Sequence, residues 1–343
     1  MRLKLLQAGL GGHGRNVGSQ FVAASPDFEY AGLIDPDPAA LQAFASRHGI
    51  SERRLYRRHE DALRETGADA LLVTAASPVH FELCRAALEH GLHVLVEKPF
   101  TLTLQDAAEL VRLAKERGLR LMVNQNYRYF SVVRGLRAAL DDPSLGALRH
   151  AHAHFFFDHD GKPYQRQMDN YILMEMSVHH VDMIRYLLED DIASVRGRTW
   201  NAAGSGYAGD PNVEAVYETK RGVPVFYASS LVAAGAADPW EGRWKFRFDR
   251  GAVYLDDMGE GYGVYVEAGD GAPRRLATAE AGREGIHGVL AEFAAAIREG
   301  REPSISGCDN LRTLAALLAT GEASRTGREV RIASDSEERG ANI

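Results

Sequence analysis

The stretch LKLLQAGLGGHG, residues 3–14, decides the fold of this 343-residue chain. Residues 3–8 form a short apolar run typical of a buried strand, and a G-x-G-x-x-G pattern, Gly9-Leu10-Gly11-Gly12-His13-Gly14, follows directly. A helical pattern then runs to about Ala24. A glycine turn between a strand and a helix lets the backbone approach a pyrophosphate, whose charge the helix N-terminus favours. This context predicts a dinucleotide-binding turn, with a glycine-rich turn that holds no ligand as the alternative.

Short apolar runs and helical patterns continue to alternate as far as about Asn124, which predicts a parallel, doubly wound sheet. The further strands expected here are 30–34, 70–74, 93–96 and 119–123, and the helices are 38–48, 79–90 and 103–117. Thr103 and Asp106 stand at the spacing of a helix cap, and Gly118 ends that helix.

After Asn124 the pattern changes to short strands separated by Gly, Asp and Pro. The strands expected are 149–157, 194–201, 213–219, 223–231, 243–248, 252–255 and 262–266, with helices at 131–140, 174–188, 288–298 and 310–324. The fold class expected is therefore α/β. Residues 1–124 form the dinucleotide-binding domain, and residues 125–343 form an α+β domain with a large, mostly antiparallel open sheet. The polar end, 334–343, is expected to fray.

Composition excludes several classes of protein. A net charge of −7 disfavours a nucleic-acid partner, since such proteins usually carry a basic patch. No apolar run approaches the roughly 20 residues that span a bilayer, so no membrane partner is expected. The only cysteines, Cys84 and Cys308, do not support a disulfide framework and fit a reducing compartment. We therefore expect a cytoplasmic protein.

Asp35 ends the second strand, where an acidic side chain accepts hydrogen bonds from ribose hydroxyls. Asp37 follows closely, and neither Arg nor Lys occurs between Asp35 and Arg47. A 2′-phosphate would meet carboxylates and no guanidinium, so the sequence favours NAD over NADP. The alternative for Asp35 is an ordinary turn residue at a strand end.

Glu97-Lys98-Pro99 ends the fourth strand, and ligands of open α/β sheets lie beyond the carboxyl ends of the strands. A lysine there is expected to face the nicotinamide, and the proline restricts its backbone to extended conformations. The peptide before Pro99 is a candidate for the cis form. A surface lysine in a strand-to-helix turn is the alternative.

Glu175, His179 and Asp182 are spaced so that one stripe of an α-helix carries all three. A carboxylate beside a histidine raises the imidazole pKa and fixes its tautomer, which suits proton exchange with an alcohol. An ordinary exposed pair of side chains is the alternative. The neighbouring His180 faces elsewhere and is expected to be structural.

These segments together resemble the Gfo/Idh/MocA family, which includes glucose-fructose oxidoreductase and the inositol dehydrogenases. The resemblance rests on the Rossmann-type glycine turn, the Asp35 strand, residues 77–80 (SPVH) and residues 91–100 (GLHVLVEKPF). It continues through 123–129 (VNQNYRY), 144–155 (SLGALRHAHAHF), 179–188 (HHVDMIRYLL) and 307–332. It therefore covers nearly the whole chain.

The resemblance implies an NAD-dependent dehydrogenase acting on the CH–OH group of a sugar or cyclitol. The catalytic residues would then be Lys98, His179 and Glu175, while Tyr127, Arg128 and Asp182 would bind substrate. The cofactor site would contain the six residues of the glycine turn, and also Asp35, Thr74, Ala75, His80, Glu97 and Lys98. Family members carry Asp-x-Gly-x-His-x-x-Asp where this chain has Glu175 and Ser177 at the first and third positions. Glu175 keeps the charge of the family's Asp but reaches one methylene further.

His150, His152 and His154 alternate along one strand and so share a face. We interpret this face as a polar sheet surface or a subunit interface rather than a metal site, and we expect no metal. The family resemblance implies that such sheets pack face to face, so a homodimer or homotetramer is expected.

The proposed chemistry is reversible hydride transfer, in which His179 takes the hydroxyl proton and Lys98 stabilises charge on the oxygen. Two other functions stay open. One is an NAD-dependent glycosidase or lyase, in which hydride leaves and returns to the same molecule. The other is a non-catalytic sensor of dinucleotide or sugar.

Overall fold

The computed structural model describes residues 1–269, 271–278 and 283–333, so the predicted fraying of 334–343 lies outside the described residues. The chain divides into two compact units. The first contains residues 1–129 and 283–311, and the second contains 130–282 and 312–343. This division differs from the predicted boundary after residue 124, because residues 283–311 return to the first unit.

Apolar packing explains that return. Helix α8, Gly285–Glu299, buries Val289, Leu290 and Phe293 in the same core as Leu5 of the first strand and Phe28 of the second. The rings of Phe28 and Phe293 stack with centroids 6.2 Å apart. The helical pattern of α8 was visible in the sequence, but its partner was not, because periodicity shows that a face is buried and not what covers it.

The first unit is built on a six-stranded sheet in which every strand pair is parallel, in the order β3-β2-β1-β4-β5-β6. Its strands are β1 Leu3–Ala8, β2 Phe28–Ile34, β3 Leu55–Tyr56, β4 Ala70–Val73, β5 His93–Val96 and β6 Leu121–Val123. Its helices include α1 Gly12–Val17, α2 Pro38–His48, α3 His59–Glu65, α4 His80–Glu89 and α5 Leu104–Glu116. The doubly wound parallel sheet is confirmed, while the short strand β3 and helix α3 were not predicted. The strand order reverses between β1 and β4, which is where such sheets bind ligands.

Local sequence explains how these elements begin. The Thr103 side chain accepts a hydrogen bond from the Asp106 backbone N–H at 3.1 Å and caps α5, as the sequence predicts. Asp37 caps α2 in the same way through the Ala39 N–H, at 2.9 Å, with proline at the first helical position.

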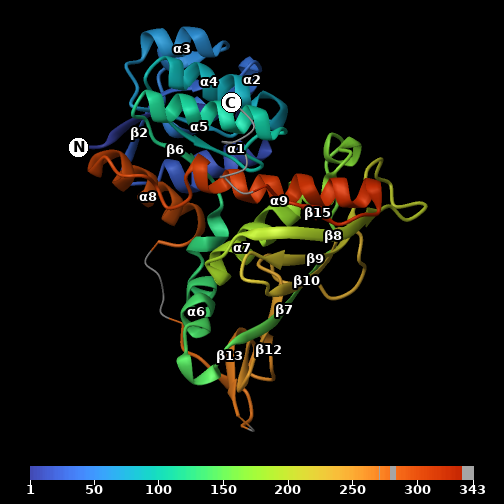
Figure 1. Ribbon diagram of the computed structural model, residues 1–343. Helices are drawn as coiled ribbons and strands as arrows, with labels where there is room; N and C mark the ends of the chain where they lie inside the picture. Colours follow the sequence, from blue (N-terminus) through green and yellow to red (C-terminus); the bar gives the residue numbers. More distant parts are fainter. Residues whose placement is uncertain (270, 279–282, 334–343) are drawn as a thin grey trace, which may run out of the picture. The chain divides into compact units, whose positions relative to one another are not determined.

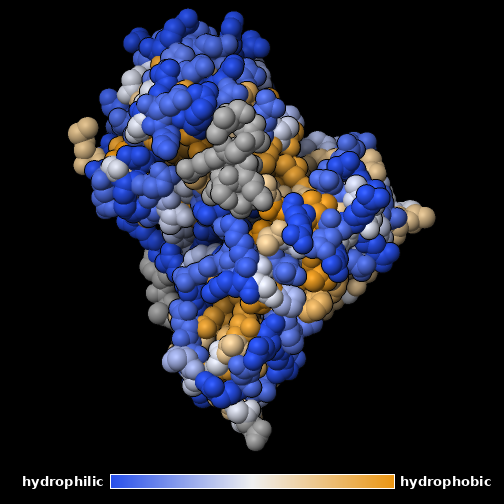
Figure 2. Space-filling view, in the orientation of Figure 1, coloured by the Kyte–Doolittle hydropathy of each residue, from blue (hydrophilic) through white to orange (hydrophobic). Residues whose placement is uncertain are grey.

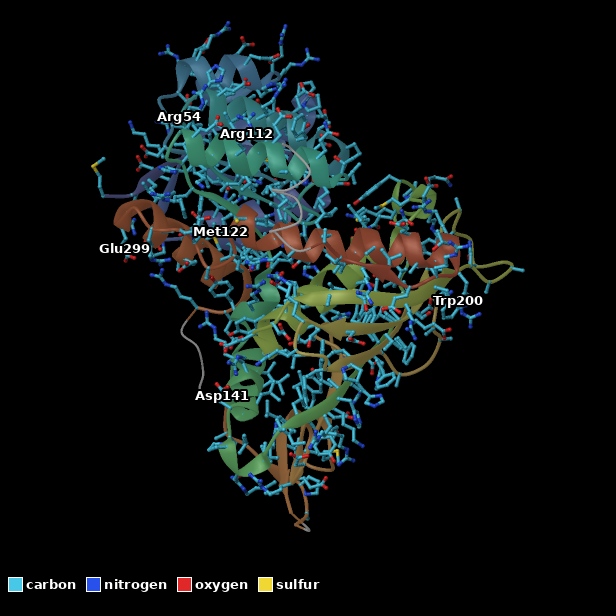
Figure 3. All side chains as sticks on the ribbon, in the orientation of Figure 1. Arg54, Arg112, Met122, Asp141, Trp200 and Glu299 are labelled. Carbon is cyan, nitrogen blue, oxygen red and sulfur yellow. The ribbon has the colours of Figure 1, made fainter. Side chains whose placement is uncertain are left out.

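Figure 3 labels Met122 of β6, whose side chain is fully buried in the core of this unit.

The second unit is built on a nine-stranded sheet in the order β14-β13-β12-β11-β7-β10-β9-β8-β15. All neighbours are antiparallel except β7 and β10, which are parallel, so the predicted mostly antiparallel sheet is confirmed. Figure 1 shows β8, β9, β10 and β7 side by side. The strands are β7 Leu148–Phe156, β8 Ile192–Trp200, β9 Asn212–Thr219, β10 Pro224–Ser230, β11 Arg243–Phe248, β12 Gly251–Asp257, β13 Tyr262–Ala268, β14 Arg274–Arg275 and β15 Val330–Arg331.

Three helices complete the description: α6 Ser131–Leu140, α7 Val178–Leu188 and α9 Gly307–Thr326. Helix α7 does not begin at residue 174 as predicted. A π-helical turn, Leu173–Ser177, precedes it without a break. A π-turn pairs each residue with the one five positions away, and such turns occur frequently at functional sites. Among the described residues, no helix is long and apolar enough to cross a membrane.

Strand alternation gives the second sheet two distinct faces. Ala151, Ala153 and Phe155 of β7 are buried on one face, and His152 and Phe226 lie on the other. We call the latter the outer face. Its members include the exposed Phe156, Val216 and Phe226. Figure 2 shows apolar residues at the surface where the strands of this unit lie.

Candidate active site

The three glycines that define the G-x-G-x-x-G pattern, Gly9, Gly11 and Gly14, have different roles in the first unit. Gly9 has a φ of +97°, and a Cβ placed there would lie 2.3 Å from the backbone nitrogen of Ala75. A Cβ at Gly14 would lie 2.1 Å from the Gly9 carbonyl oxygen. At Gly11, by contrast, no described atom lies within 4 Å of an ideal Cβ. Gly9 and Gly14 therefore allow close packing, while Gly11 leaves open space beside the start of α1 at Gly12, where a pyrophosphate approaches in this fold.

The buried side chain of Gln7 supports the glycine turn through hydrogen bonds. The Gln7 Nε2 donates to the Gly14 carbonyl at 2.8 Å and to the Thr74 hydroxyl at 3.1 Å, and its Oε1 accepts from the Tyr30 hydroxyl at 3.0 Å. Thr74 in turn donates to the Gly9 carbonyl at 2.7 Å. Thr74 thus shapes the turn from inside the fold. Gln7 was not identified from the sequence, although a single polar residue in an apolar strand is a signal that could have found it.

Asp35 is held at the end of β2 by two backbone donors. Its carboxylate accepts from the Leu10 N–H at 2.6 Å and from the Asp37 N–H at 2.9 Å. An ionised carboxylate has about four acceptor positions, so two bonds fix its orientation and leave capacity for ribose hydroxyls. The sequence placed the Asp37 carboxylate beside the ribose site. In the structure this side chain caps α2 by accepting a hydrogen bond from the Ala39 N–H.

The Glu97-Lys98-Pro99 turn follows β5, and the Lys98–Pro99 peptide is cis. Lys98 is half-buried, while Glu97 is only 5% exposed. The Glu97 carboxylate accepts from Asn124 Nδ2 at 2.6 Å and from the Lys98 N–H at 3.3 Å, and lies 3.0 Å from His13 Nε2. Burial raises the pKa of Glu97, but His13, Asn124 and Lys98 outweigh it and the net pKa is lowered. The turn before the predicted catalytic lysine therefore contains a buried, ionised carboxylate.

His80 lies beneath the same turn and is 1% exposed. Its Nδ1 is 2.9 Å from the Pro99 carbonyl oxygen and its Nε2 is 3.0 Å from the Ala75 carbonyl oxygen. Burial lowers its pKa, although the two carbonyls act in the opposite direction. Both ring nitrogens therefore face backbone acceptors. His80 therefore joins the loop after β4 to the Lys98 turn, and its part in cofactor binding stays a prediction.

Tyr127 and Arg128 follow β6, as predicted, and both side chains are largely buried. The Arg128 Nη2 lies 2.7 Å from the Asp309 Oδ2 at the beginning of α9. The ion pair gives Arg128 a structural partner within the first unit. Substrate contact by either residue stays a prediction.

In the second unit, the stripe predicted for Glu175, His179 and Asp182 is altered. Glu175 lies in the π-turn, so the α-helical spacing that related it to His179 does not apply across that step. The Glu175 Oε1 accepts from Gln165 Nε2 at 2.7 Å. Gln165, which is 4% exposed, was not identified from the sequence, because the loop that carries it has no helical or strand pattern.

His179 and Asp182 both belong to α7 and keep their predicted spacing, at 7% and 1% exposure. The Asp182 Oδ1 accepts from the Thr313 hydroxyl at 3.0 Å, and Arg185 Nη1 contacts the same Thr313 oxygen at 2.9 Å. Asp182 is thus buried beside Thr313 within the second unit, and substrate contact by this residue stays a prediction. The bond from Thr313 also ties α7, which carries His179, to α9.

His180 has two structural partners, as its position on the helix indicated. Its Nδ1 lies 2.9 Å from the Tyr227 hydroxyl, and its Nε2 lies 3.0 Å from the Trp240 carbonyl. Burial lowers the pKa of His180 to about 4, so it is neutral at physiological pH. Within the described ranges, no three His, Cys, Asp or Glu side chains are grouped so as to hold a metal ion.

The first unit fits a dinucleotide. Open space lies beside Gly11, and the Asp35 carboxylate is fixed at the end of β2. The buried Asn124 Oδ1, after β6, has no hydrogen-bond partner among the described residues, which leaves an acceptor for an amide or hydroxyl donor.

Comparison with family models gives two matches. Residues 3–125 match the model described as "Oxidoreductase family, NAD-binding Rossmann fold", and residues 133–254 match the "GFO/IDH/MocA C-terminal domain". The chain belongs to the Gfo/Idh/MocA oxidoreductase family. The first unit is accordingly an NAD-binding Rossmann domain, and the predicted family, cofactor and enzyme class are confirmed.

Relatives within the Gfo/Idh/MocA family have related names. D-apiose dehydrogenase of Paraburkholderia graminis is 28% identical over 89% of this chain and 84% of its own length. Inositol 2-dehydrogenase of Rhizobium meliloti is 26% identical over 95% of this chain and 98% of its own. A solved oxidoreductase from Agrobacterium radiobacter, in complex with NAD+, L-tartaric acid and magnesium, superposes with a TM-score of 0.86 at 24% identity. That alignment covers 100% of both chains and shows the shared fold.

Proposed function

We propose that this enzyme transfers a hydride between NAD and a secondary alcohol of a sugar or cyclitol. The observation that supports it most is the Glu97-Lys98-Pro99 turn. It places a half-buried lysine at the carboxyl end of β5, in the sheet whose glycine turn belongs to an NAD-binding domain. The nicotinamide ring of bound NAD supplies the hydride acceptor or donor.

The residues of the chain would handle the proton and the charge. His179 takes the hydroxyl proton during oxidation, and general-base catalysis of this kind contributes about 10²–10⁴-fold. Lys98, as a cation, donates a hydrogen bond to the same oxygen and stabilises the negative charge that develops there. Glu175 orients the imidazole. Tyr127 and Arg128 bind the substrate hydroxyls.

The substrate class rests on the relatives. Those named D-apiose dehydrogenase, 1,5-anhydro-D-fructose reductase and inositol 2-dehydrogenase all have names that denote polyhydroxylated rings or chains. Polar groups beside Glu175, including the Gln165 amide, suit recognition of several hydroxyls. The assay below distinguishes this dehydrogenase from two other functions. One is a glycosidase or lyase that oxidises its substrate transiently, and the other is a sensor that binds dinucleotide or sugar without a reaction.

One experiment separates the three functions. The purified protein is incubated with NAD and a panel of cyclitols, aldoses and amino sugars, and NADH is followed by its absorbance. The dehydrogenase is supported by net NADH formation with one or more free polyols. Cleavage of a glycoside without net NADH would indicate the lyase-type reaction. Binding of NAD and sugar with no turnover in either assay would indicate a sensor.

We also propose that the chain is a cytoplasmic homodimer or homotetramer that associates through the outer face of the second sheet. Phe226 is 41% exposed there, and its ring stacks on His152 with centroids 4.7 Å apart. An open hollow of about 630 Å³ adjoins them, lined by residues that include Arg196 and Glu214. A face with apolar rings and charges of both signs can complement a second copy of itself. Light scattering should give a mass above 37.6 kDa for the wild type and a smaller assembly for Phe226→Glu.

A further inference from the structure

His13 and Glu97 form a contact that joins two turns of the nucleotide-binding unit. His13 is the fifth residue of the glycine motif and is the second residue of α1, while Glu97 immediately precedes Lys98. The His13 Nε2 lies 3.0 Å from the Glu97 Oε1. The side chain of His13 is 52% exposed and that of Glu97 is 7% exposed. The exposed imidazole of His13 therefore lies over the buried carboxylate of Glu97.

Three described residues that face Glu97, namely His13, Asn124 and Lys98, favour its ionised form. His13 reaches it from α1, Asn124 Nδ2 donates to it at 2.6 Å from beyond β6, and the Lys98 N–H donates at 3.3 Å. The Lys98 ammonium also attracts it, and His80 of α4 is close enough for the carboxylate to raise the pKa of that imidazole. The carboxylate is therefore a fixed negative charge within the turn region.

Glu97 has an electrostatic consequence for the ligand. A pyrophosphate bound at the glycine turn that carries His13 would bring phosphate charges toward the buried Glu97 carboxylate. Like charges repel more strongly where water is excluded than in bulk solvent. Lys98 partly offsets this, but the imidazole of His13 is the titratable group that belongs to the glycine turn itself and contacts Glu97. The protonated imidazole offsets the repulsion between the phosphates and the Glu97 carboxylate.

We propose that His13 is a positioning residue whose protonated fraction rises when the dinucleotide binds, so that its imidazolium balances the Glu97 carboxylate and the phosphates together. Binding then depends on pH with a definite sign. Because the complex holds more protons than the free protein, affinity for NAD falls as pH rises, by at most tenfold per pH unit for one proton. The Glu97 bond to the Lys98 backbone further links the pair to the turn that carries the catalytic lysine.

This inference rests on NAD binding and not on the proposed substrate, so the two can fail separately. Titration calorimetry of NAD into the full-length protein at pH 7 and pH 8.5, in two buffers of different ionisation enthalpy, measures the number of protons taken up. We expect a fractional uptake by the wild type. His13→Gln should abolish it and weaken NAD binding about tenfold at pH 7, with a smaller effect at pH 8.5.

Three further variants sharpen the result. His13→Lys carries a permanent charge and should bind NAD without proton uptake and with little dependence on pH. Glu97→Gln should also lose the uptake, because the carboxylate that attracts the proton is gone. His90→Gln is the control, since His90 is exposed at the end of α4 and should leave the uptake unchanged. Thermal melting verifies that each variant is folded.

The kinetic signature is specific as well. His13→Gln should raise KM for NAD while kcat at saturating NAD stays within about twofold, as expected for a residue that does not touch the reacting atoms. Equal proton uptake by the wild type and His13→Gln would overturn the inference, as would no uptake by the wild type. Failure of every polyol to react would leave this result standing and count only against the proposed substrate.

Discussion

The nucleotide turns of the first unit and the helix of the second are built in different ways. Around Gly9 and Asp35, the supporting groups lie at the ends of predicted strands: the Thr74 hydroxyl donates to the Gly9 carbonyl, and the Leu10 N–H donates to the Asp35 carboxylate. Around His179, the support comes from Gln165 and Thr313, which are 14 and 134 residues away in the sequence. Both sites depend on tertiary contacts. Those of the first site lie at strand ends that the sequence pattern predicts, whereas Gln165 of the second lies in a loop with no helical or strand pattern.

The comparison predicts its largest effect at His179. His179→Asn should lower kcat about 10³-fold, since it removes the base that accepts the hydroxyl proton, while affinity for NAD stays unchanged. The neighbouring His180→Asn should mainly lower the melting temperature, because it disturbs the contacts with Tyr227 and Trp240. Steady-state kinetics and thermal melting measure both. A folded His179→Asn variant with wild-type turnover would remove His179 from the mechanism.

Lys98 should give the next largest effect. Lys98→Ala should lower kcat about 10²–10³-fold, because it removes a cationic donor to the reacting oxygen. NAD binding, measured by quenching of protein fluorescence or by calorimetry, should stay within about threefold. Lys115→Ala is the matched control, since Lys115 is exposed in the last turn of α5. Equal turnover by the two variants would refute the assignment of Lys98.

Asp35 tests the cofactor preference. Asp35→Asn removes the charge and should weaken NAD binding about tenfold, a loss of about 1.4 kcal/mol. Affinity for NADP should rise relative to NAD, because the carboxylate that repels a 2′-phosphate is gone. The ratio of kcat/KM for the two cofactors measures the change. An unchanged ratio would mean that the preference is set elsewhere in the site.

A pair of polar-to-apolar substitutions gives the smallest effects and sharpens the comparison most directly. Gln7→Leu removes the donors to Gly14 and Thr74 and should raise KM for NAD several-fold with kcat preserved. Thr313→Val removes the donor to Asp182 and should lower kcat several-fold with KM for NAD preserved. Each should cost about 1–3 kcal/mol of stability in chemical denaturation. Identical kinetic profiles for the two variants would contradict the separation of roles.

The sequence predicted most of the fold and the outline of the nucleotide site. Strand-helix alternation predicted the parallel sheet. The pattern Gly9-Leu10-Gly11, between a strand and a helix, predicted a dinucleotide cofactor. The sequence did not predict β3, whose two residues are too few to show a period. It also did not predict that α8 packs against the core of the first unit. It also could not give the π-turn before α7, because one extra residue per turn leaves no distinct apolar pattern. Gln165 escaped notice because its loop has no helical or strand pattern, and Thr313 because its partner Asp182 is 131 residues away in the sequence.

The return of residues 283–311 to the first unit has a practical consequence for dissecting the protein. A gene fragment that stops near residue 129 would encode all six strands of the parallel sheet and yet lack Val289, Leu290 and Phe293. The core face that those side chains cover would meet solvent, and such a fragment should aggregate rather than bind NAD. An excised nucleotide module therefore needs the α8 segment rejoined by an engineered linker, with residues 130–282 removed as an insertion.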